Sequence, residues 1–122
     1  MMIPQDIQMC VADALQDDDI ENIDSVLSML NHEYESSWRA VRGSLFTIEE
    51  VRSALEQLMA AGLVTPCAEQ PPLNDCVPVP VDQVGTAFPW DVVWFHLEPS
   101  GREATRRWWE TEGKLKFPLA NG

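Results

Sequence analysis

The sequence predicts an α+β fold in a single domain, with several helices followed by a β-unit and a last helix. Three observations predict it. Apolar residues recur at helical spacing through most of residues 3–62, six of the nine prolines fall between residues 66 and 90, and the β-rich segment DVVWFHL stands directly before a helix-start signal. At 122 residues the chain is long enough to bury one hydrophobic core.

The N-terminal third predicts two amphipathic helices. Residues 3–16 carry one apolar face, and Pro4 suits a first helical turn. Asp17-Asp18-Asp19 then forms a polar break that can cap the next helix, whose first turn holds Glu21 where it complements the helix dipole. The second apolar stripe consists of Ile20, Ile23, Val26, Leu27, Leu30 and Tyr34.

A weaker helical spacing continues through residues 32–45, where Trp38, Val41 and Leu45 recur and Gly43 ends the segment. We interpret this stretch as a prolonged second helix or as a short extra one. The sequence does not distinguish these two alternatives.

The best-defined helix lies between Phe46 and Val64. Thr47 is a good N-cap, and Glu50 three residues later completes an S/T-x-x-E capping box. Gly62 suits the left-handed position after a helix end, so the chain becomes extended from Leu63. The apolar stripe of this helix consists of Ile48, Val51, Leu55, Leu58 and Met59.

The remaining chain predicts strands and one helix. Residues 63–67 form a short strand broken by Pro66, residues 66–90 form a long irregular connection that is extended over residues 77–81, and residues 91–97 form a strong strand. The last helix begins at Pro99 with Glu98 as its cap, or at Ser100 in a capping box with Glu103, and stops near Gly113. Residues 114–122 are expected to be a loosely held C-terminal tail.

Two segments together resemble winged-helix regulators of the MarR and PadR types. VRSALEQLMAAGLV is similar to their recognition helix and following strand, and FHLEPSGREA is similar to their strand-to-helix junction, commonly Leu-Thr-x-x-Gly-Arg-x-Ala. The match consists of Leu97, Gly101, Arg102 and Ala104, with Glu98 where threonine is usual. The resemblance implies a winged helix-turn-helix domain over residues 1–113, with three or four N-terminal helices, a small antiparallel β-wing that includes the long proline-rich segment 66–90, and a C-terminal helix.

The charge distribution bears on what such a domain would bind. The chain has a formal charge of −12, and residues 1–35 hold nine acidic and no basic side chains. Residues 66–98 also lack Lys and Arg, and Glu49 and Glu50 open the presumed recognition helix. Because DNA-binding proteins gain affinity by neutralising phosphates with Lys and Arg, this pattern disfavours nucleic acid. We therefore expect a non-enzymatic acidic module that binds another macromolecule, with a protein favoured.

The alternative is a DNA-binding transcriptional regulator of the MarR or PadR type. In that case a small cationic patch would contact the nucleic acid, formed by Arg39, Arg42, Arg52 and Ser53. The competing interpretation is that these arginines pair with nearby carboxylates on a solvated surface.

The last helix is the expected oligomer or partner interface. Trp108 and Trp109 point about 100° apart on a helix, so one of them is expected in the core and the other at an interface. Arg102 and Arg106 share a face at i, i+4 spacing and are expected to pair with the acidic N-terminal region of the same chain or of a partner. A homodimer is therefore a possible assembly.

The sequence indicates no catalytic, metal or cofactor site. His32 and His96 are the only histidines, and Cys67 and Cys76 are nine residues apart without a zinc-binding pattern. With Cys10 the cysteine count is odd, which favours reduced thiols. The chain has neither a signal-peptide pattern nor an apolar run of membrane-spanning length, so a cytoplasmic protein is expected.

Overall fold

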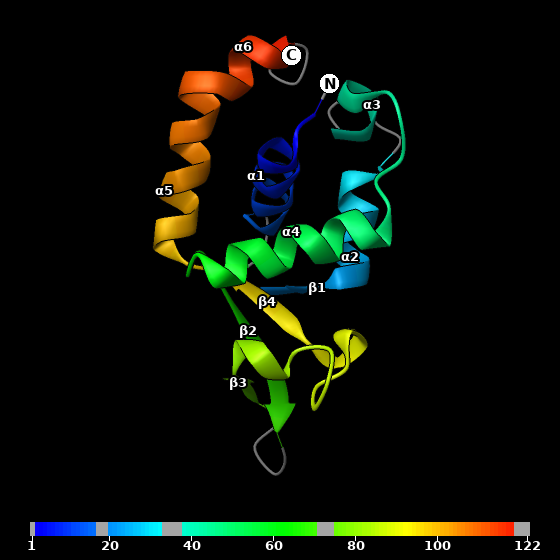
Figure 1. Cartoon of the computed structure of the whole chain (residues 1–122), viewed down its shortest axis with the longest axis vertical. Coiled ribbons are helices and arrows are strands. Elements are labelled where there is room, and N and C mark those ends of the chain that lie inside the picture. The colour runs from blue at the N-terminus through cyan, green and yellow to red at the C-terminus, as the bar shows by residue number, and fades with distance from the viewer. Residues whose placement is uncertain (1, 17–19, 33–37, 71–74, 119–122) are drawn as a thin grey trace.

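Helices and a small antiparallel sheet occupy opposite ends of the molecule (Figure 1). The computed structural model describes residues 2–16, 20–32, 38–70 and 75–118. The α+β class expected from the sequence is confirmed. The helices are α1 (Pro4–Leu15), α2 (Ile23–Leu30), α3 (Trp38–Arg42), α4 (Ile48–Ala60), α5 (Pro99–Trp108) and α6 (Lys114–Lys116), and the strands are β1 (Ile20–Asn22), β2 (Val64–Gln70), β3 (Asp75–Pro78) and β4 (Trp94–Leu97).

The capped helix expected after Phe46 is confirmed as α4. The Glu50 N–H donates to the Thr47 hydroxyl (3.2 Å), and the Thr47 N–H donates to the Glu50 carboxylate (3.0 Å). Gly62 has φ 75°, a left-handed conformation that ends the helix, and β2 follows directly. Local signals therefore define both ends of this element.

The apolar stripe begins at Ile20 and therefore predicts too early a start for the second helix, since α2 begins at Ile23. Ile20–Asn22 is a strand that pairs with β4, with Ile20 opposite His96 and Asn22 opposite Trp94. The Asn22 side chain accepts from the Ser25 N–H (2.8 Å) and so caps α2. The segment after α2 contains a separate short helix, α3, rather than a prolonged α2. The expected cap at Asp17–Asp19 and the contribution of Tyr34 lie outside the described residues.

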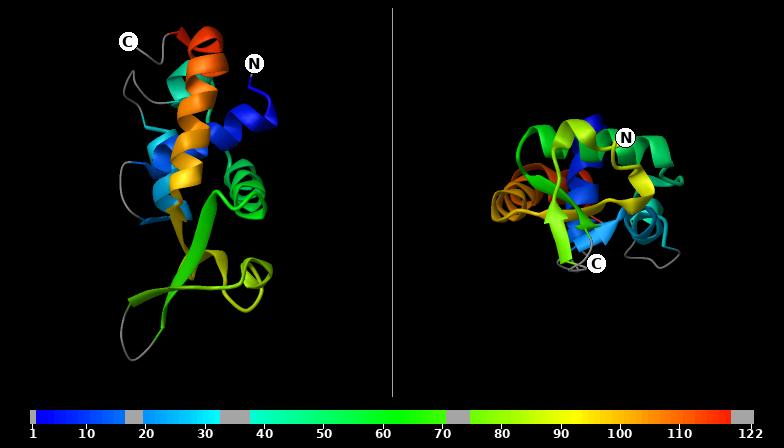
Figure 2. Two further views of the ribbon diagram at one scale, coloured as in Figure 1. Left: turned by 90° about the vertical axis from the view of Figure 1, so that its left-hand side faces the viewer. Right: turned by 90° about the horizontal axis from the view of Figure 1, so that it is seen from below.

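The strand order in the sheet is β1-β4-β2-β3, with all neighbours antiparallel. Pro66 does not break β2, which continues to Gln70, because the Pro66 carbonyl still accepts from the Val79 N–H (3.0 Å). The expected strand at residues 91–97 is shorter, since Trp90–Val92 forms a 3₁₀ turn (η2) and only Trp94–Leu97 pairs. The β2–β3 hairpin projects away from the helices (Figure 2).

The core lies between the helices and β4. Phe95 and Leu97 alternate with half-exposed neighbours on β4 and are fully buried together with residues of α1 and α4 such as Val11 and Leu55. The last helix begins at Pro99 with Glu98 at the N-cap position, which decides between the two starts that the sequence left open.

The segment after α5 is packed, contrary to the expectation of a loose tail from Lys114. A π-helical turn, Trp109–Gly113 (η3), leads into α6, and Phe117 is 7% exposed. The Phe117 ring lies 5.9 Å from the Trp38 ring and 6.3 Å from the Trp108 ring, measured between centroids. The aromatic side chain therefore anchors this segment, while residues 119–122 lie outside the described part.

The expectation of reduced thiols is wrong for two of the three cysteines. Cys67 on β2 and Cys76 on β3 form a disulfide with their Cα atoms 5.4 Å apart. In the antiparallel register Cys67 faces Pro78 and Cys76 faces Glu69, so the two cysteines are diagonal neighbours. Cys10 is free and buried in α1. Within the described residues, none of the helices combines the length and the apolar character that a membrane span requires.

Candidate macromolecule-binding surface

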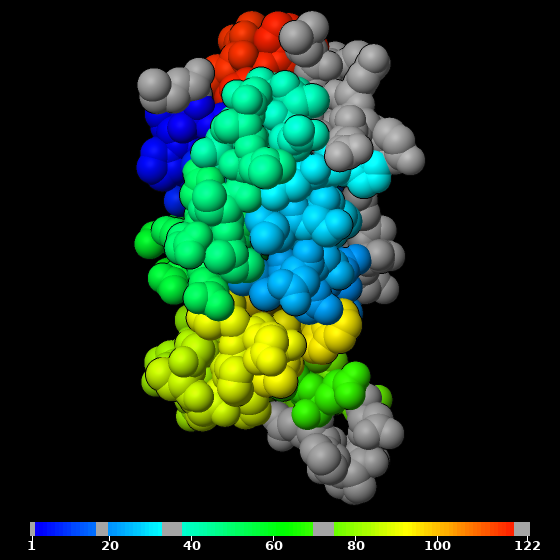
Figure 3. All heavy atoms as spheres, turned by 90° about the vertical axis from the view of Figure 1, so that its right-hand side faces the viewer, coloured from blue at the N-terminus to red at the C-terminus, as the bar shows by residue number. Residues whose placement is uncertain are grey.

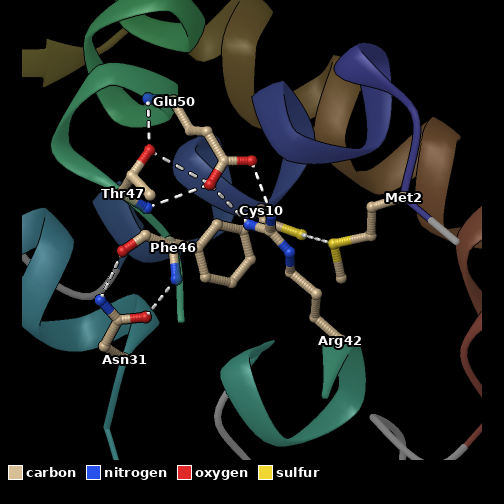
Figure 4. Close-up of polar contacts among 7 residues, drawn as sticks. All are labelled: Met2, Cys10, Asn31, Arg42, Phe46, Thr47 and Glu50. Carbon is tan, nitrogen blue, oxygen red and sulfur yellow. Dashed lines mark hydrogen bonds and ion pairs between the residues drawn. The ribbon is translucent and has the colours of Figure 1, made fainter. Parts of the chain in front are cut away.

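The entry into α4 is held by a polar network that joins three helices (Figure 4). Asn31, at the end of α2, donates to the Phe46 carbonyl (2.9 Å) and accepts from the Phe46 N–H (2.7 Å). Phe46 is itself buried, and the Asn31 side chain satisfies both of its backbone polar groups, which would otherwise lack partners. Together with the Thr47–Glu50 capping box, this contact fixes the orientation of the start of α4 relative to the end of α2.

Arg42 of α3 completes the network from the other side. Its guanidinium donates two hydrogen bonds to the Glu50 carboxylate, at 3.0 and 2.7 Å, and its Cζ lies 4.6 Å from the centre of the Phe46 ring. Burial opposes ionisation of Glu50, but hydrogen bonds from Arg42 and from the Thr47 N–H outweigh it and lower the pKa of Glu50. Glu50 is therefore a carboxylate whose charge is balanced by Arg42.

The predicted cationic residues have different neighbours. Arg42 is engaged by Glu50, whereas the Arg52 guanidinium lies 5.7 Å from the Trp90 ring in the loop after the hairpin. Ser53 is exposed next to Arg52 on α4, and Arg39 is half-buried on α3. The structure thus brings Arg42 to the start of α4 and directs Arg52 toward the loop.

The solvent-facing side of α4 carries more negative than positive charge. We call this surface the α4 face; its exposed polar members are Glu49, Arg52, Ser53, Glu56 and Gln57. In the part of the chain that the structure describes, Glu49 and Glu56 form no ion pair. Figure 3 shows α2, α3 and α4 together on one side of the molecule, above the segment that leads into β4.

The hairpin and the loop after it add to this acidic character. Exposed carboxylates on the described residues of this region belong to Glu69, Asp75, Asp82 and Asp91. Val77, Val81 and Val92 are also exposed, at 37–46% of their surface. The projecting part of the molecule therefore presents carboxylates and apolar side chains.

Trp108 and Trp109 belong to an aromatic cluster within one chain. Trp108 is buried and donates its indole N–H to Asp6 (3.2 Å), while Trp109 is half-buried with its ring 6.1 Å from that of Trp38. Trp108 is the tryptophan of the core, and the interface role expected for the other remains a prediction. The partner of Trp109, however, is Trp38 of the same chain.

Two arginines of α5 pair with nearby carboxylates of the same segment, so within the chain Arg106 does not reach the N-terminal region as expected. Arg106 forms ion pairs with Glu103 (2.5 Å) and Glu110 (2.9 Å), because the i, i+3 and i, i+4 spacings place these groups on one face. Arg107 also approaches Glu103 at 3.6 Å, and Arg102 is exposed on the same helix.

Sequence reasoning missed the cation that does reach the N-terminal region. Lys116 of α6 approaches Asp6 at 3.3 Å, and Asp6, which is fully buried, also accepts from the Ile3 N–H (3.0 Å). An acidic residue on the apolar side of α1 was the available signal. Its partners, about a hundred residues away, could not be deduced from local spacing.

Cys10 is fully buried, in surroundings that oppose formation of a thiolate. Burial raises the pKa of the Cys10 thiol far above its usual value, and the nearby charges of Asp13 and Asp6 raise it further. The described residues contain no group of three or more His, Cys, Asp or Glu side chains placed to hold a metal ion.

Comparisons with models of protein families, with curated proteins and with solved structures found no match to this chain.

Proposed function

We propose that the chain is a winged-helix domain in which α4 takes the position of the recognition helix. The order of elements supports this assignment, since four helices and strand β1 precede β2, a projecting hairpin follows, and β4 leads into α5. The two sequence segments that resemble MarR- and PadR-type regulators fall on α4–β2 and on the β4–α5 junction, as that fold requires. The β2–β3 hairpin and its loop then correspond to the wing.

We further propose that this module acts by binding a basic protein partner, without catalysing a reaction. One observation supports a protein partner above all: among the described residues, Glu49 and Glu56 of the α4 face form no ion pair, while Arg42 is engaged by Glu50. A surface of this charge repels phosphate and attracts Lys and Arg side chains. With a formal charge of −12, the chain would also be steered toward a basic partner at long range.

DNA is the second candidate, because Glu50 is neutralised and Arg52 and Ser53 are exposed on α4. A fluorescence-anisotropy titration with mixed duplex DNA at about 50 mM salt separates the two functions. For the protein-binding function we expect no saturation up to about 10 µM protein. Micromolar or tighter binding that weakens steeply with salt would establish the DNA-binding alternative.

The protein partner itself is accessible by site-directed crosslinking. A photo-crosslinking amino acid placed at Gln57 on the α4 face should form a covalent protein adduct in the cells that produce the chain. The same group at Arg107, which is exposed on α5, is the matched control and should give no adduct with that partner, whereas an adduct with a second copy of this chain would report self-association through α5. Equal adducts with the same partner at both positions, or an adduct to nucleic acid at Gln57, would contradict the proposal.

Self-association through α5 and a cytoplasmic location remain predictions. Light scattering on the wild type tests self-association, and a strictly monomeric protein at high concentration would contradict it. Alkylation of thiols in intact cells tests the second, because the reducing cytoplasm of most cells would keep Cys67 and Cys76 as thiols rather than as the disulfide.

A further inference from the structure

A groove lies between the N-terminal halves of α1 and α4, next to the α4 face. Its volume is about 310 Å³, which is at the lower end of the range for ligand sites and suits a single long side chain. The groove is lined by Pro4, Ile7 and Gln8 from α1 and by Glu49, Ser53 and Ala54 from α4.

The walls of the groove combine an apolar floor with acceptor groups. Pro4, Ile7 and Ala54 supply hydrocarbon surface, whereas Gln8, Glu49 and Ser53 each carry an oxygen that can accept a hydrogen bond. The lining includes no Lys, Arg or His. An occupant therefore needs an apolar stem and a head that donates hydrogen bonds.

The charge balance defines the head group. Glu50 also borders the groove, but its carboxylate is bound bidentately by Arg42. Glu49 forms no ion pair within the described residues and so leaves one negative charge uncompensated at the groove. An anionic head is disfavoured here, even at the start of a helix, because Glu49 and Glu50 already complement the α4 dipole.

We propose that this groove takes a lysine side chain from a basic segment of the partner protein. The four methylene groups of lysine would cover Ile7 and Ala54, and the ammonium group, with three donors, would bind Glu49 with Ser53 or Gln8. This proposal deepens the protein-binding function and depends on it. It names the chemistry that the partner must present at one point of the α4 face.

The test uses two tripeptides and amide NMR spectra of the ¹⁵N-labelled full chain. The first probe is acetyl-Leu-Lys-Leu-amide, and the second replaces lysine with norleucine, which keeps the stem and lacks the ammonium group. We expect the lysine peptide to shift the amide signals of Ile7, Gln8, Ser53 and Ala54, with at least fivefold weaker binding of the norleucine peptide.

A matched pair of variants separates the groove from the general acidic field. Glu49→Gln should weaken binding of the lysine peptide about fivefold, whereas Glu56→Gln, an identical charge change on the same helix outside the groove lining, should alter it less than twofold. Both side chains are exposed, so neither change is expected to unfold the protein.

Equal effects of the two variants, or no shifts of the groove amides, would overturn the lysine site. Those outcomes leave the crosslinking result at Gln57 unaffected, so a failure of the groove is distinguishable from a failure of the protein-binding function.

Discussion

At the residue scale, the Glu50 carboxylate holds a helix cap and an arginine at the same time. It accepts from the Thr47 N–H as a member of the capping box, and it binds Arg42 through both oxygens. Side-chain exposures of 21% for Arg42 and 25% for Glu50 place the pair at the edge of the core. A pair in this position contributes more than a fully exposed one, because water screens it less.

Replacing Arg42 should therefore weaken the fold. We expect Arg42→Met to lower the free energy of unfolding by about 1 kcal/mol at neutral pH, since a partly buried carboxylate loses its partner. Urea unfolding followed by tryptophan fluorescence measures it, with Arg107→Met as the control because Arg107 is 73% exposed. A loss no larger than that of the control would mean that the bidentate pair contributes nothing to stability.

The same pair has a pH dependence of defined sign. Because folding lowers the pKa of Glu50, its contribution is fully present above the usual value of 4.5 and is lost as the pH falls through the lowered pKa. The stability difference between wild type and Arg42→Met should thus shrink between pH 7 and about pH 3. A difference that stays constant over this range would assign the effect of Arg42 to its packing on Phe46 instead.

Asp6 is the second residue on which the fold depends. It has no exposed surface, and it accepts hydrogen bonds from the Ile3 N–H, the Trp108 indole and Lys116. Asp6→Ala should cost about 2–3 kcal/mol, because the buried Trp108 N–H then lacks an acceptor. Equilibrium unfolding provides the measurement, with Gln5→Ala on the exposed side of α1 as the control; equal losses would contradict this role.

At the element scale, the β2–β3 hairpin and the helices are stabilised by different interactions. Strand β3 pairs only with β2 among the described strands, and three of its four residues are exposed. The Cys67–Cys76 disulfide therefore supplies a link that burial does not. Closing a loop of this length lowers the entropy of the unfolded chain by the equivalent of about 2.5 kcal/mol in the chain-entropy model.

Reduction should consequently destabilise the wild type by up to about 2.5 kcal/mol. Urea unfolding with and without dithiothreitol measures the effect, and the double variant Cys67→Ala/Cys76→Ala should show no response to the reductant. If the wild type unfolds identically in both conditions, the link does not contribute to global stability.

The elements also show which parts of the fold the sequence could predict. Helix α4 was predicted at both ends because Thr47, Glu50 and Gly62 act within a few residues of the ends that they define. Strand β1 was missed, since its three residues are a strand only through pairing with β4, about 75 positions along the chain. Periodicity alone assigned Ile20 to a helix because its spacing to Ile23 is compatible with one.

The same distinction between local and long-range signals applies to the candidate site. The exposed residues of α4 follow from helical periodicity, so Glu49, Arg52 and Ser53 could be placed on its solvent side in advance. The pairing of Arg42 with Glu50 could not, because it depends on how α3 packs against the start of α4. The disulfide was missed because an odd cysteine count is compatible with one bond and one free thiol, as found here.

At the scale of the whole molecule, the excess negative charge must oppose folding, since compaction brings carboxylates together. The formal charge of −12 remains after all eight Lys and Arg side chains are counted, and the five ion pairs within the described residues involve only four of the 20 Asp and Glu side chains. The repulsion remains over the α4 face, the hairpin and the N-terminal region. A basic partner of the kind proposed would relieve part of this repulsion on binding.

Salt should therefore stabilise the protein, opposite to the response of a fold held by surface ion pairs. Raising sodium chloride from about 10 mM to about 500 mM shortens the screening length from about 30 Å to a few ångströms, and we expect the free energy of unfolding to rise by about 1 kcal/mol. Glu56→Lys replaces a negative with a positive charge on the α4 face. This change should raise stability at low salt and reduce the stabilisation by added salt. Thermal unfolding at a series of salt concentrations measures both effects. Stability that falls with salt would mean that the ion pairs outweigh the repulsion, and the acidic surface would then carry no free-energy cost that a basic partner could relieve.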